Sequence, residues 1–396
     1  MIALRYSLLV FGLSLLTACG GSDDNAEPPA PLTDFEPTKV LHEQWSLSTH
    51  SGVEQQFLFI EPLLLNDRII TAGRDGTVTV VDVNNGKRLQ KIDLDTTLSG
   101  GVGGDDNLWL LATKDGELIA IDGTTGLIKW RVNVPSEVLI KPVLSKESVF
   151  ARTVDGQIIS LSRASGKLQW SYQQTKPALT LRGSGQLVLT RDRIYTGMAN
   201  GRVVALSVDN GEVIWDVALS TPQGHSEIQR LVDVDGHAEL FGYIYYVAGY
   251  QGRIAAIDAQ KGQFLWARDF SSYSGVTVDA KAVYSSDERS HIWALDRFSG
   301  ATLWKQEKLQ ARYVTRPVLF DDLLVVGDAE GYLHLMSRFD GSFVARILVD
   351  GYGIGEMLSS GTGILVPPVV TDDAIIVSTR NGMLYSYRLS DLAKAE

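Results

Sequence analysis

A pair of carboxylates, Asp233 and Asp235, followed directly by Gly236, is the spacing in this sequence that comes nearest to a metal site. Such a pair opens the calcium loop of helix-loop-helix proteins, in which the twelfth residue is a glutamate that binds the ion through both oxygens. Counted from Asp233, the twelfth residue is Ile244, which offers no side-chain oxygen. We therefore interpret the pair as part of a polar loop and expect no calcium there.

Residues with the chemistry for other metal or redox sites are few. The chain of 396 residues contains six histidines and a single cysteine, Cys19. Zinc sites take closely spaced cysteines and histidines, and redox motifs take two cysteines, but neither spacing occurs here. The histidines are therefore interpreted as structural, and no internal disulfide bond, metal, cofactor or catalytic residue is predicted.

Neither a dinucleotide nor a nucleic acid is expected as a ligand. The glycine-rich stretch Gly100 to Gly104 is followed by an apolar strand, Leu108 to Ala112, and not by a helix whose N-terminus could bind a pyrophosphate. The formal net charge is −11, whereas phosphate binding needs clustered lysine and arginine. The glycine-rich stretch is interpreted as a loop between structural elements.

The position of Cys19, shortly after an apolar N-terminal run, indicates a role other than metal binding or disulfide formation. Residues 1–18 contain one basic residue and then an apolar run, Tyr6 to Leu16, that is too short to span a bilayer and is typical of a secretory signal. The run leads into Leu-Thr-Ala-Cys19, the lipobox pattern at which bacterial lipoprotein precursors are cleaved and the cysteine is lipidated. Gly20 follows, and not the aspartate that usually retains such proteins at the inner membrane. We expect a protein anchored to the periplasmic face of the outer membrane; the alternative is an ordinary signal peptide with an incidental cysteine.

Composition divides the rest of the chain. The stretch from Gly20 to Pro37 is rich in proline, glycine and acidic residues, so residues 19–38 are predicted to be a lipidated, disordered tether. Residues 39–390 have the composition of one packed domain, and residues 391–396 are predicted to be a frayed tail.

A repeat organises this domain and must position any site. Its clearest copy, Asp115 to Trp130, reads as a tight turn, an alternating strand, a turn closed by glycine and a short strand ending in tryptophan. Marked by the residue that closes the first turn, eight copies occur 38 to 51 residues apart: Gly76, Gly116, Gly156, Gly201, Gly252, Ser290, Gly331 and Gly382. This period, with strands and no helical pattern, predicts an all-β fold, an eight-bladed β-propeller of four-stranded blades.

The two ends of the domain are predicted to complete one blade. The eighth repeat stops at Leu389 without a final strand, whereas Leu41 to Trp45 resembles the end of a repeat that has lost its beginning. The N-terminal strand should therefore join the last blade, closing the ring and removing open sheet edges. The tryptophans that recur at one repeat position, such as Trp130, are predicted to pack between neighbouring sheets and not to form a ligand platform.

The repeat motif, Asp-Gly-x-h-x-Ala-h-Asp followed by Thr-Gly-x-h-h-Trp with h apolar, resembles the pyrroloquinoline quinone-type repeat of eight-bladed propellers. Two classes of protein share this repeat. Quinone-dependent dehydrogenases hold the quinone and a calcium ion on the propeller axis, commonly beneath a pair of adjacent cysteines, and they are longer than this chain. The BamB family consists of non-enzymatic lipoproteins of the BAM complex, which inserts β-barrel proteins into the outer membrane.

The resemblance to the BamB family covers nearly the whole chain and includes two further segments, Leu179 to Gly183 and Glu227 to Asp235. In that family the corresponding segments are implicated in docking to the barrel subunit BamA through its periplasmic POTRA domains. The resemblance therefore implies partner-binding roles for Leu179, Leu181, Arg182, Asp233 and Asp235. It also implies association with the other BAM subunits, and it leaves direct contact with nascent outer-membrane proteins open. The insertion Asp350 to Gly363 looks longer than the family's usual loop, so no role is transferred to it.

Repeat lengths indicate the same surface. Repeats longer than 40 residues gain their extra residues in loops between blades, after Trp170 and after Trp215, and insertions concentrated on one face often mark a binding surface. Arg182 and Asp233 both lie nineteen residues before their markers, so they occupy equivalent positions on adjacent blades. Alternatively, these two residues only pair with each other to order the loops. The alternative functions are a quinone-dependent periplasmic dehydrogenase and a propeller that binds a peptide or polysaccharide on this face.

Overall fold

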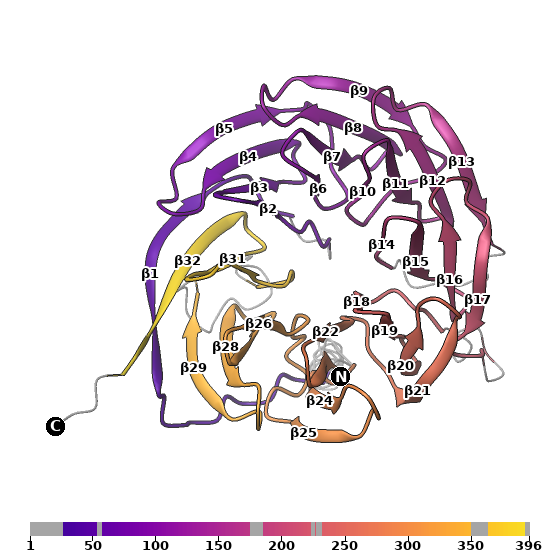
Figure 1. Ribbon diagram of the computed structural model, residues 1–396. Helices are drawn as coiled ribbons and strands as arrows, with labels where there is room; N and C mark the ends of the chain where they lie inside the picture. The colour runs from indigo at the N-terminus through magenta and orange to yellow at the C-terminus, as the bar shows by residue number, and fades with distance from the viewer. Residues whose placement is uncertain are drawn as a thin grey trace, which may run out of the picture.

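The computed structural model describes residues 27–53, 58–174, 185–222, 226, 232–349 and 363–392. These residues form eight four-stranded antiparallel sheets arranged as a closed ring, which confirms the predicted eight-bladed propeller (Figure 1). The described part of the chain contains no helix, and therefore none that is long and apolar enough to cross a membrane.

Each of the first seven blades takes four consecutive strands, ordered from the axis outward. Blades one and two comprise β2 (Leu63–Leu65), β3 (Arg68–Ala72), β4 (Thr77–Asp82), β5 (Arg88–Asp93), then β6 (Gly103–Gly104), β7 (Leu108–Ala112), β8 (Glu117–Asp122) and β9 (Ile128–Asn133). Blades three and four comprise β10 (Val143–Leu144), β11 (Ser148–Arg152), β12 (Gln157–Ser162), β13 (Leu168–Gln173), then β14 (Val188–Leu189), β15 (Arg193–Gly197), β16 (Arg202–Ser207) and β17 (Val213–Ala218). Blades five and six comprise β18 (Glu239–Phe241), β19 (Ile244–Ala248), β20 (Gly252–Asp258), β21 (Gln263–Phe270), then β22 (Val276–Val278), β23 (Ala282–Ser286), β24 (Ile292–Asp296) and β25 (Thr302–Gln306). Blade seven comprises β26 (Val318–Phe320), β27 (Leu323–Gly327), β28 (Tyr332–Ser337) and β29 (Phe343–Leu348).

The eighth blade closes the ring with both ends of the chain, as predicted. It joins β30 (Val369–Val370), β31 (Ile375–Ser378) and β32 (Met383–Asp391) to β1 (Lys39–Ser48), which lies outermost. In Figure 1 the indigo β1 runs beside the yellow β32, and the two strands pair antiparallel from Lys39 with Asp391 to Ser48 with Met383. The last strand therefore extends two residues beyond Leu389.

The core lies between blades because the second and third strands are apolar on both faces. Every residue of β7 is buried, and one cluster joins Leu110 and Ala120 of blade two to Val149 and Leu161 of blade three. Each sheet therefore buries its faces only when a neighbour stacks on it, which explains why the repeats form a ring and not separate domains.

The recurring tryptophans fasten each blade to the next, which confirms the packing role predicted for them. Each donates its indole N–H to the carbonyl three residues before the glycine that closes the last turn of the following blade, at 2.8 to 3.0 Å: Trp45 to Val83, Trp130 to Arg163, Trp170 to Val208, Trp215 to Ala259, Trp266 to Arg297 and Trp304 to Arg338. The indole lies against that glycine, so that a Cβ at Gly211, for example, would collide with Trp170. A left-handed φ of 73° at Gly211 makes glycine the residue suited to this turn for a second reason.

Two junctions depart from this pattern. In blade one Gln90 takes the tryptophan position and donates to the carbonyl of Thr125 in blade two. In blade seven the position is Ala345, because blade eight is closed by two chain ends and has no turn joining its third strand to its fourth. The junction between blades seven and eight therefore lacks the indole contact found at six of the other junctions.

Candidate partner-docking site

The long inter-blade loops share one face of the ring with the turns that join the second and third strands of each blade; we call it the insertion face. Asp233, in the loop from β17 to β18, pairs with Tyr250 in the turn after β19, and the amide of Tyr250 donates to the carbonyl of Asp233 at 2.7 Å. This pairing supports the single face inferred from repeat lengths. The loops from β13 to β14 and from β29 to β30 leave the ring at the equivalent strand ends.

Both aspartates of the Asp-Val-Asp segment are buried. Asp233 is 1% exposed and Asp235 is 7% exposed. An oxygen of Asp235 lies 3.1 Å from Nη2 of Arg152, itself 7% exposed, at the end of β11. The geometry therefore gives Asp235 a partner within the ring, and it is not a side chain displayed on the surface.

The Arg152–Asp235 ion pair also brings together the two loops that carry the motifs. Gly185, the first described residue after the Leu179 to Gly183 segment, packs against the same arginine, because a Cβ there would collide with the Arg152 guanidinium and approach Asp235. One buried contact thus holds the β17–β18 loop, from blade four to blade five, close to the end of the β13–β14 loop, from blade three to blade four. Leu179, Leu181 and Arg182 lie outside the described residues, as does residue range 350–362 of the insertion.

Sequence reasoning missed Arg152, although a signal was present. The residue four positions before each repeat marker is small in the other seven blades: Ala72, Ala112, Gly197, Ala248, Ser286, Gly327 and Ser378. A single arginine among alanine, glycine and serine at one structural position marks a site with its own partner. Aligning this position across the repeats would have drawn attention to Arg152.

A second set of polar residues lines the propeller axis, two positions before the first residue of an innermost strand: Glu61, Lys141, His237 and Arg316. Lys141 donates to Glu61 at 2.9 Å, and Arg316 donates to Thr277 at 2.6 Å. Burial alone would raise the pKa of Glu61, but the charges of Lys141 and Arg316 lower it. At the same level, burial and these two cations hold the pKa of His237 well below its usual value, so this histidine is neutral.

The axis carries paired charges and no assembled metal site. Among the residues that the structure describes, no three histidine, cysteine, aspartate or glutamate side chains come close enough together to hold a metal ion. Lys141 and Arg316 could attract a carboxylate ligand, but both already interact with Glu61. Arg316 also interacts with Glu239. The described residues therefore show no free cationic centre on the axis for an acidic cofactor.

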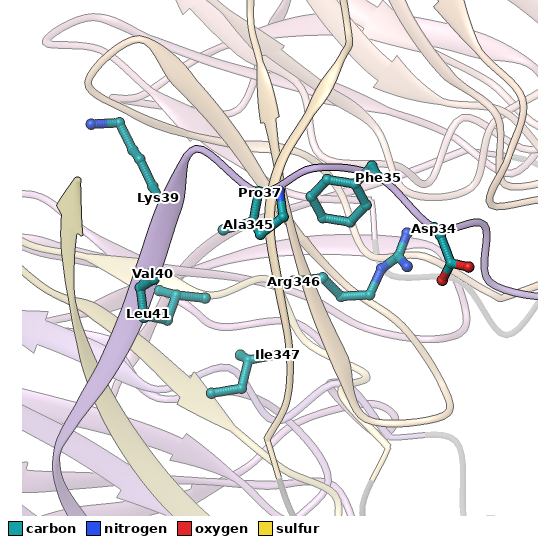
Figure 2. A pocket seen from close by; sticks show the side chains of 9 residues that line it. All are labelled: Asp34, Phe35, Pro37, Lys39, Val40, Leu41, Ala345, Arg346 and Ile347. Atoms are coloured by element: carbon teal, nitrogen blue, oxygen red, sulfur yellow. The ribbon is translucent and has the colours of Figure 1, made fainter. Parts of the chain in front are cut away.

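A groove of about 370 Å³ lies at the junction of blades seven and eight (Figure 2). It is lined by Asp34, Phe35, Pro37, Lys39, Val40, Leu41, Ala345, Arg346 and Ile347. Ala345, which occupies the position of the missing tryptophan, is one of these lining residues. The groove lies on the outer rim of the ring, away from the axis and from the two motif loops.

A buried ionic network stabilises blade seven beside this groove. Asp328, with no exposed surface, accepts hydrogen bonds from Arg312 at 2.7 Å and from His334 at 2.9 Å. Arg346 donates to the other ring nitrogen of His334 at 3.1 Å, which fixes this histidine as the neutral tautomer. Burial alone would raise the pKa of Asp328, but these hydrogen bonds and the Arg312 charge lower it, so it is ionised at neutral pH.

Replacing Asp328 by Asn is expected to lower the free energy of unfolding by about 3 kcal/mol, the lower end of the usual range for a broken buried ion pair, because Arg312 keeps Glu330 but loses its fully buried carboxylate. Asp322→Asn is the matched control: it breaks an exposed pair with Arg338, worth about 0–1 kcal/mol. Chemical denaturation of both variants measures the difference. Equal stability of the two variants would contradict the role given to the network.

His50, on the insertion face beside the closing strand, is expected to make the ring sensitive to acid. Its Nδ1 accepts a hydrogen bond from the amide of Gly52 at 3.0 Å, and burial lowers its pKa from 6.5 to about 4. The unfolded chain therefore takes up a proton that the folded ring does not. Stability should fall by up to about 1.4 kcal/mol per pH unit between pH 6.5 and 4 through this residue. Melting curves across this range should show a smaller slope for His50→Asn; an unchanged slope would refute the assignment.

Comparison with known proteins agrees with this geometry. The family model described as outer membrane protein assembly factor BamB matches residues 74–306. Curated proteins of that name are 36% identical in Bordetella pertussis, over 98% of this chain and 97% of the relative, and 39% identical in Kangiella koreensis, over 96% and 95%. The crystal structure of BamB from Moraxella catarrhalis superposes with a TM-score of 0.79 at 26% identity, covering 88% of this chain and all of that one.

The propeller alone would not decide between the two classes of protein that carry this repeat. Quinohemoprotein alcohol dehydrogenase from Comamonas testosteroni superposes with a TM-score of 0.68 over 88% of this chain and 76% of its own, but at 13% identity, which shows the shared fold only. Identity of 30% or more over nearly the whole length is found with proteins named BamB. This chain belongs to the BamB family of outer membrane protein assembly factors.

Proposed function

We propose that this protein is a non-enzymatic scaffold subunit of the BAM complex that docks to BamA and assists the insertion of outer-membrane proteins. Full-length similarity to proteins named outer membrane protein assembly factor BamB carries the proposal. Lipidation at Cys19 would anchor the ring to the periplasmic face of the outer membrane. The remaining BAM subunits would then be neighbours of the ring through the complex.

The docking contact is proposed on the insertion face, around the loop that contains Leu179, Leu181 and Arg182. Two leucines in a surface loop between blades would supply apolar anchors, and an arginine beside them would supply directional, charge-assisted hydrogen bonds. Asp233 and Asp235 belong to the same site in a supporting role, because both are buried. The Arg152–Asp235 ion pair supports this division of roles, since it connects the ends of both loops.

Truncation of the loop should separate direct contact from support. Leu181→Ala and Arg182→Ala are each expected to weaken BamA binding by on the order of 2 kcal/mol, the usual threshold for an interface hot spot, without changing the melting temperature. Asp235→Ala should lower both the melting temperature and BamA binding, because it leaves Arg152 buried without its carboxylate. BamA capture from solubilised membranes, run beside thermal melts, measures both effects.

Leu127→Ala is the matched control for these variants. Leu127 is 69% exposed but lies in the turn after β8, on the face opposite the insertion face. It should leave both BamA capture and melting temperature unchanged. Undiminished capture by a ring carrying Leu181→Ala, Arg182→Ala and Asp235→Ala together would end the docking proposal.

Absence of catalysis is part of the proposal. The charges that face the axis are already paired with one another, and this supports a structural role for them. Adding pyrroloquinoline quinone, calcium and an electron acceptor to the purified ring should give no reduction of the acceptor. Substrate-dependent reduction would favour the quinone-dependent dehydrogenase instead.

A further inference from the structure

Residues 27–38, part of the segment predicted to be a tether, lie against the ring; we call them the N-terminal strap. The strap forms hydrogen bonds to blade seven, and to the loop that leads into it, at three points along its length. At one end the amide of Ala30 donates to the carbonyl of Gln310 at 2.9 Å, and at the other the amide of Thr38 donates to the carbonyl of Val344 at 3.0 Å. Between them, Arg346 donates to the carbonyl of Thr33 at 3.0 Å.

Phe35 anchors the middle of the strap. Its ring centroid lies 5.4 Å from that of Phe343, and the guanidinium of Arg346 lies 5.0 Å from its centre (Figure 2). Arg312 adds a hydrogen bond to the carbonyl of Ala30 at 2.9 Å. Arg312 and Arg346 are held by the buried Asp328 and His334, so the strap rests on a rigid part of the ring.

The strap shortens the link to the proposed lipid anchor. Glu27 lies eight positions after Cys19, and this link spans at most about 29 Å in any conformation at roughly 3.6 Å per residue. A link that began only at Lys39 would span up to about 72 Å at the same rise, because Lys39 lies twenty positions after Cys19. A docked strap therefore keeps its exit point close to the bilayer.

The strap leaves the ring on the insertion face, at the loop from β25 to β26. Gln310 in this loop contacts both Ala30 and the side chain of Glu27. Backbone hydrogen bonds continue from there across blade six: Ala311 donates to Arg289, and Glu288 donates to Ser271. Three segments thus form one continuous edge at the point where the strap leaves the ring: the β21–β22 loop before blade six, the β23–β24 turn within it and the β25–β26 loop after it.

This edge carries two exposed tyrosines. Tyr313 is 55% exposed and Tyr273 is 38% exposed. Tyr313 also has a φ of 51°, a left-handed conformation that is costly for a bulky residue and is maintained only when the surroundings impose it. Tyr313 therefore combines an exposed side chain with a strained backbone conformation.

We propose that this edge, with Tyr273 and Tyr313, is the part of the ring that contacts the lipid headgroups of the outer membrane; the inference rests on the proposed lipidation of Cys19. Tyrosine rings favour the headgroup level, where the apolar ring and the polar hydroxyl are both satisfied. The exposed charges nearby are of both signs, Glu288 and Glu307 with Arg289 and Lys308, so anionic lipids are not required. The β17–β18 loop, which contains Asp233 and Asp235, adjoins this edge where Gly236 packs on Gly275, whereas the β13–β14 loop leaves the ring farther away, between blades three and four (Figure 1).

Fluorescence quenching on vesicles tests this orientation. Lipidation consumes the thiol of the chain's single cysteine, so a cysteine introduced elsewhere can be labelled alone. Lys308→Cys reports on the proposed edge, and Lys281→Cys, in the turn between β22 and β23 on the opposite face of blade six, is the matched control. In lipidated full-length protein on phosphatidylethanolamine-rich vesicles with nitroxide headgroups, the label at position 308 should be quenched several-fold more strongly than the label at position 281.

Two further variants test the cause of the difference. Tyr273→Ser with Tyr313→Ser should weaken quenching at position 308 while the protein still pellets with the vesicles. Phe35→Ala, which loosens the strap, should reduce the contrast between the two labelled positions. Equal quenching at both positions in wild-type protein that pellets with vesicles would overturn this inference alone, whereas failure of wild-type protein to pellet would overturn the proposed lipid anchor and this inference with it.

Discussion

Deletion of Lys39–Ser48 is expected to cost more than about 5 kcal/mol, a large part of the 5–15 kcal/mol that stabilises a typical domain. The deletion leaves β32 as an open edge along nine paired positions. It also removes Trp45, which donates to the carbonyl of Val83 and packs on Gly86 of blade one. Trp45 is half-buried, so truncation of its side chain should cost no more than the roughly 3–5 kcal/mol of a fully buried tryptophan, and removal of the whole strand should lower the free energy of unfolding further.

Chemical denaturation of the deletion variant, Trp45→Ala and Gln44→Ala should rank these losses. Gln44 is exposed on the same strand and its side chain donates to the carbonyl of His42, so its truncation should have little effect. We expect the deletion to be the least stable, Trp45→Ala intermediate and Gln44→Ala unchanged. A deletion variant that melts at the temperature of the complete ring would contradict closure by β1.

The sequence alone predicted the ring because one local pattern recurs eight times with the same physical cause. Each copy needs a left-handed turn, formed by glycine in six copies, as at Gly116 with a φ of 76°, by Gln251 in the fifth and by Ser290 in the sixth, and an apolar strand such as β8 after it. A repeat whose faces are both apolar can be buried only by its neighbours, so the count of copies gave the count of blades. Closure of the ring was predicted from the same pattern, because Trp45 stands at the tryptophan position of a repeat whose earlier strands do not precede it in the chain.

The strap could not be read from the sequence in this way. Its contacts come from one phenylalanine, Phe35, and from backbone carbonyls that accept hydrogen bonds from Arg312 and Arg346. A single aromatic residue among prolines has no periodicity, and the two arginines lie about 280 to 310 positions away in the chain. Composition therefore indicated a tether, while long-range packing places residues 27–38 on blade seven.

The candidate site was predicted in position but not in the state of its acidic residues. Carboxylates are rarely buried, so the sequence favours exposed positions for Asp233 and Asp235. Burial of Asp235 depends on Arg152, which lies in a different blade and contacts it only after the ring has formed. Sequence reasoning considered a pairing of Asp233 with Arg182, but it did not consider Arg152.

Cys19→Ala is expected to abolish stable association with the outer membrane. An acyl chain contributes about 0.8 kcal/mol per buried CH₂, so roughly twelve buried CH₂ groups contribute about 10 kcal/mol that no other described part of the chain replaces. The folded ring should melt at the same temperature, because Cys19 lies outside residues 39–391, which form its strands. Membrane fractionation and thermal melts check the two halves of this expectation, and intact-mass measurement shows whether the cysteine is lipidated.

Ser22→Ala is the control, since it changes the same short segment and leaves the cysteine in place. It should fractionate with membranes and carry the mass of the lipidated protein, whereas Cys19→Ala should be released and keep its signal segment. BamA capture separates anchoring from docking: released Cys19→Ala protein should still bind solubilised BamA, because the motif loops are unchanged. A wild-type protein whose mass shows an unmodified thiol would refute the anchor, and loss of BamA capture by the released ring would mean that docking depends on the lipid as well as on the insertion face.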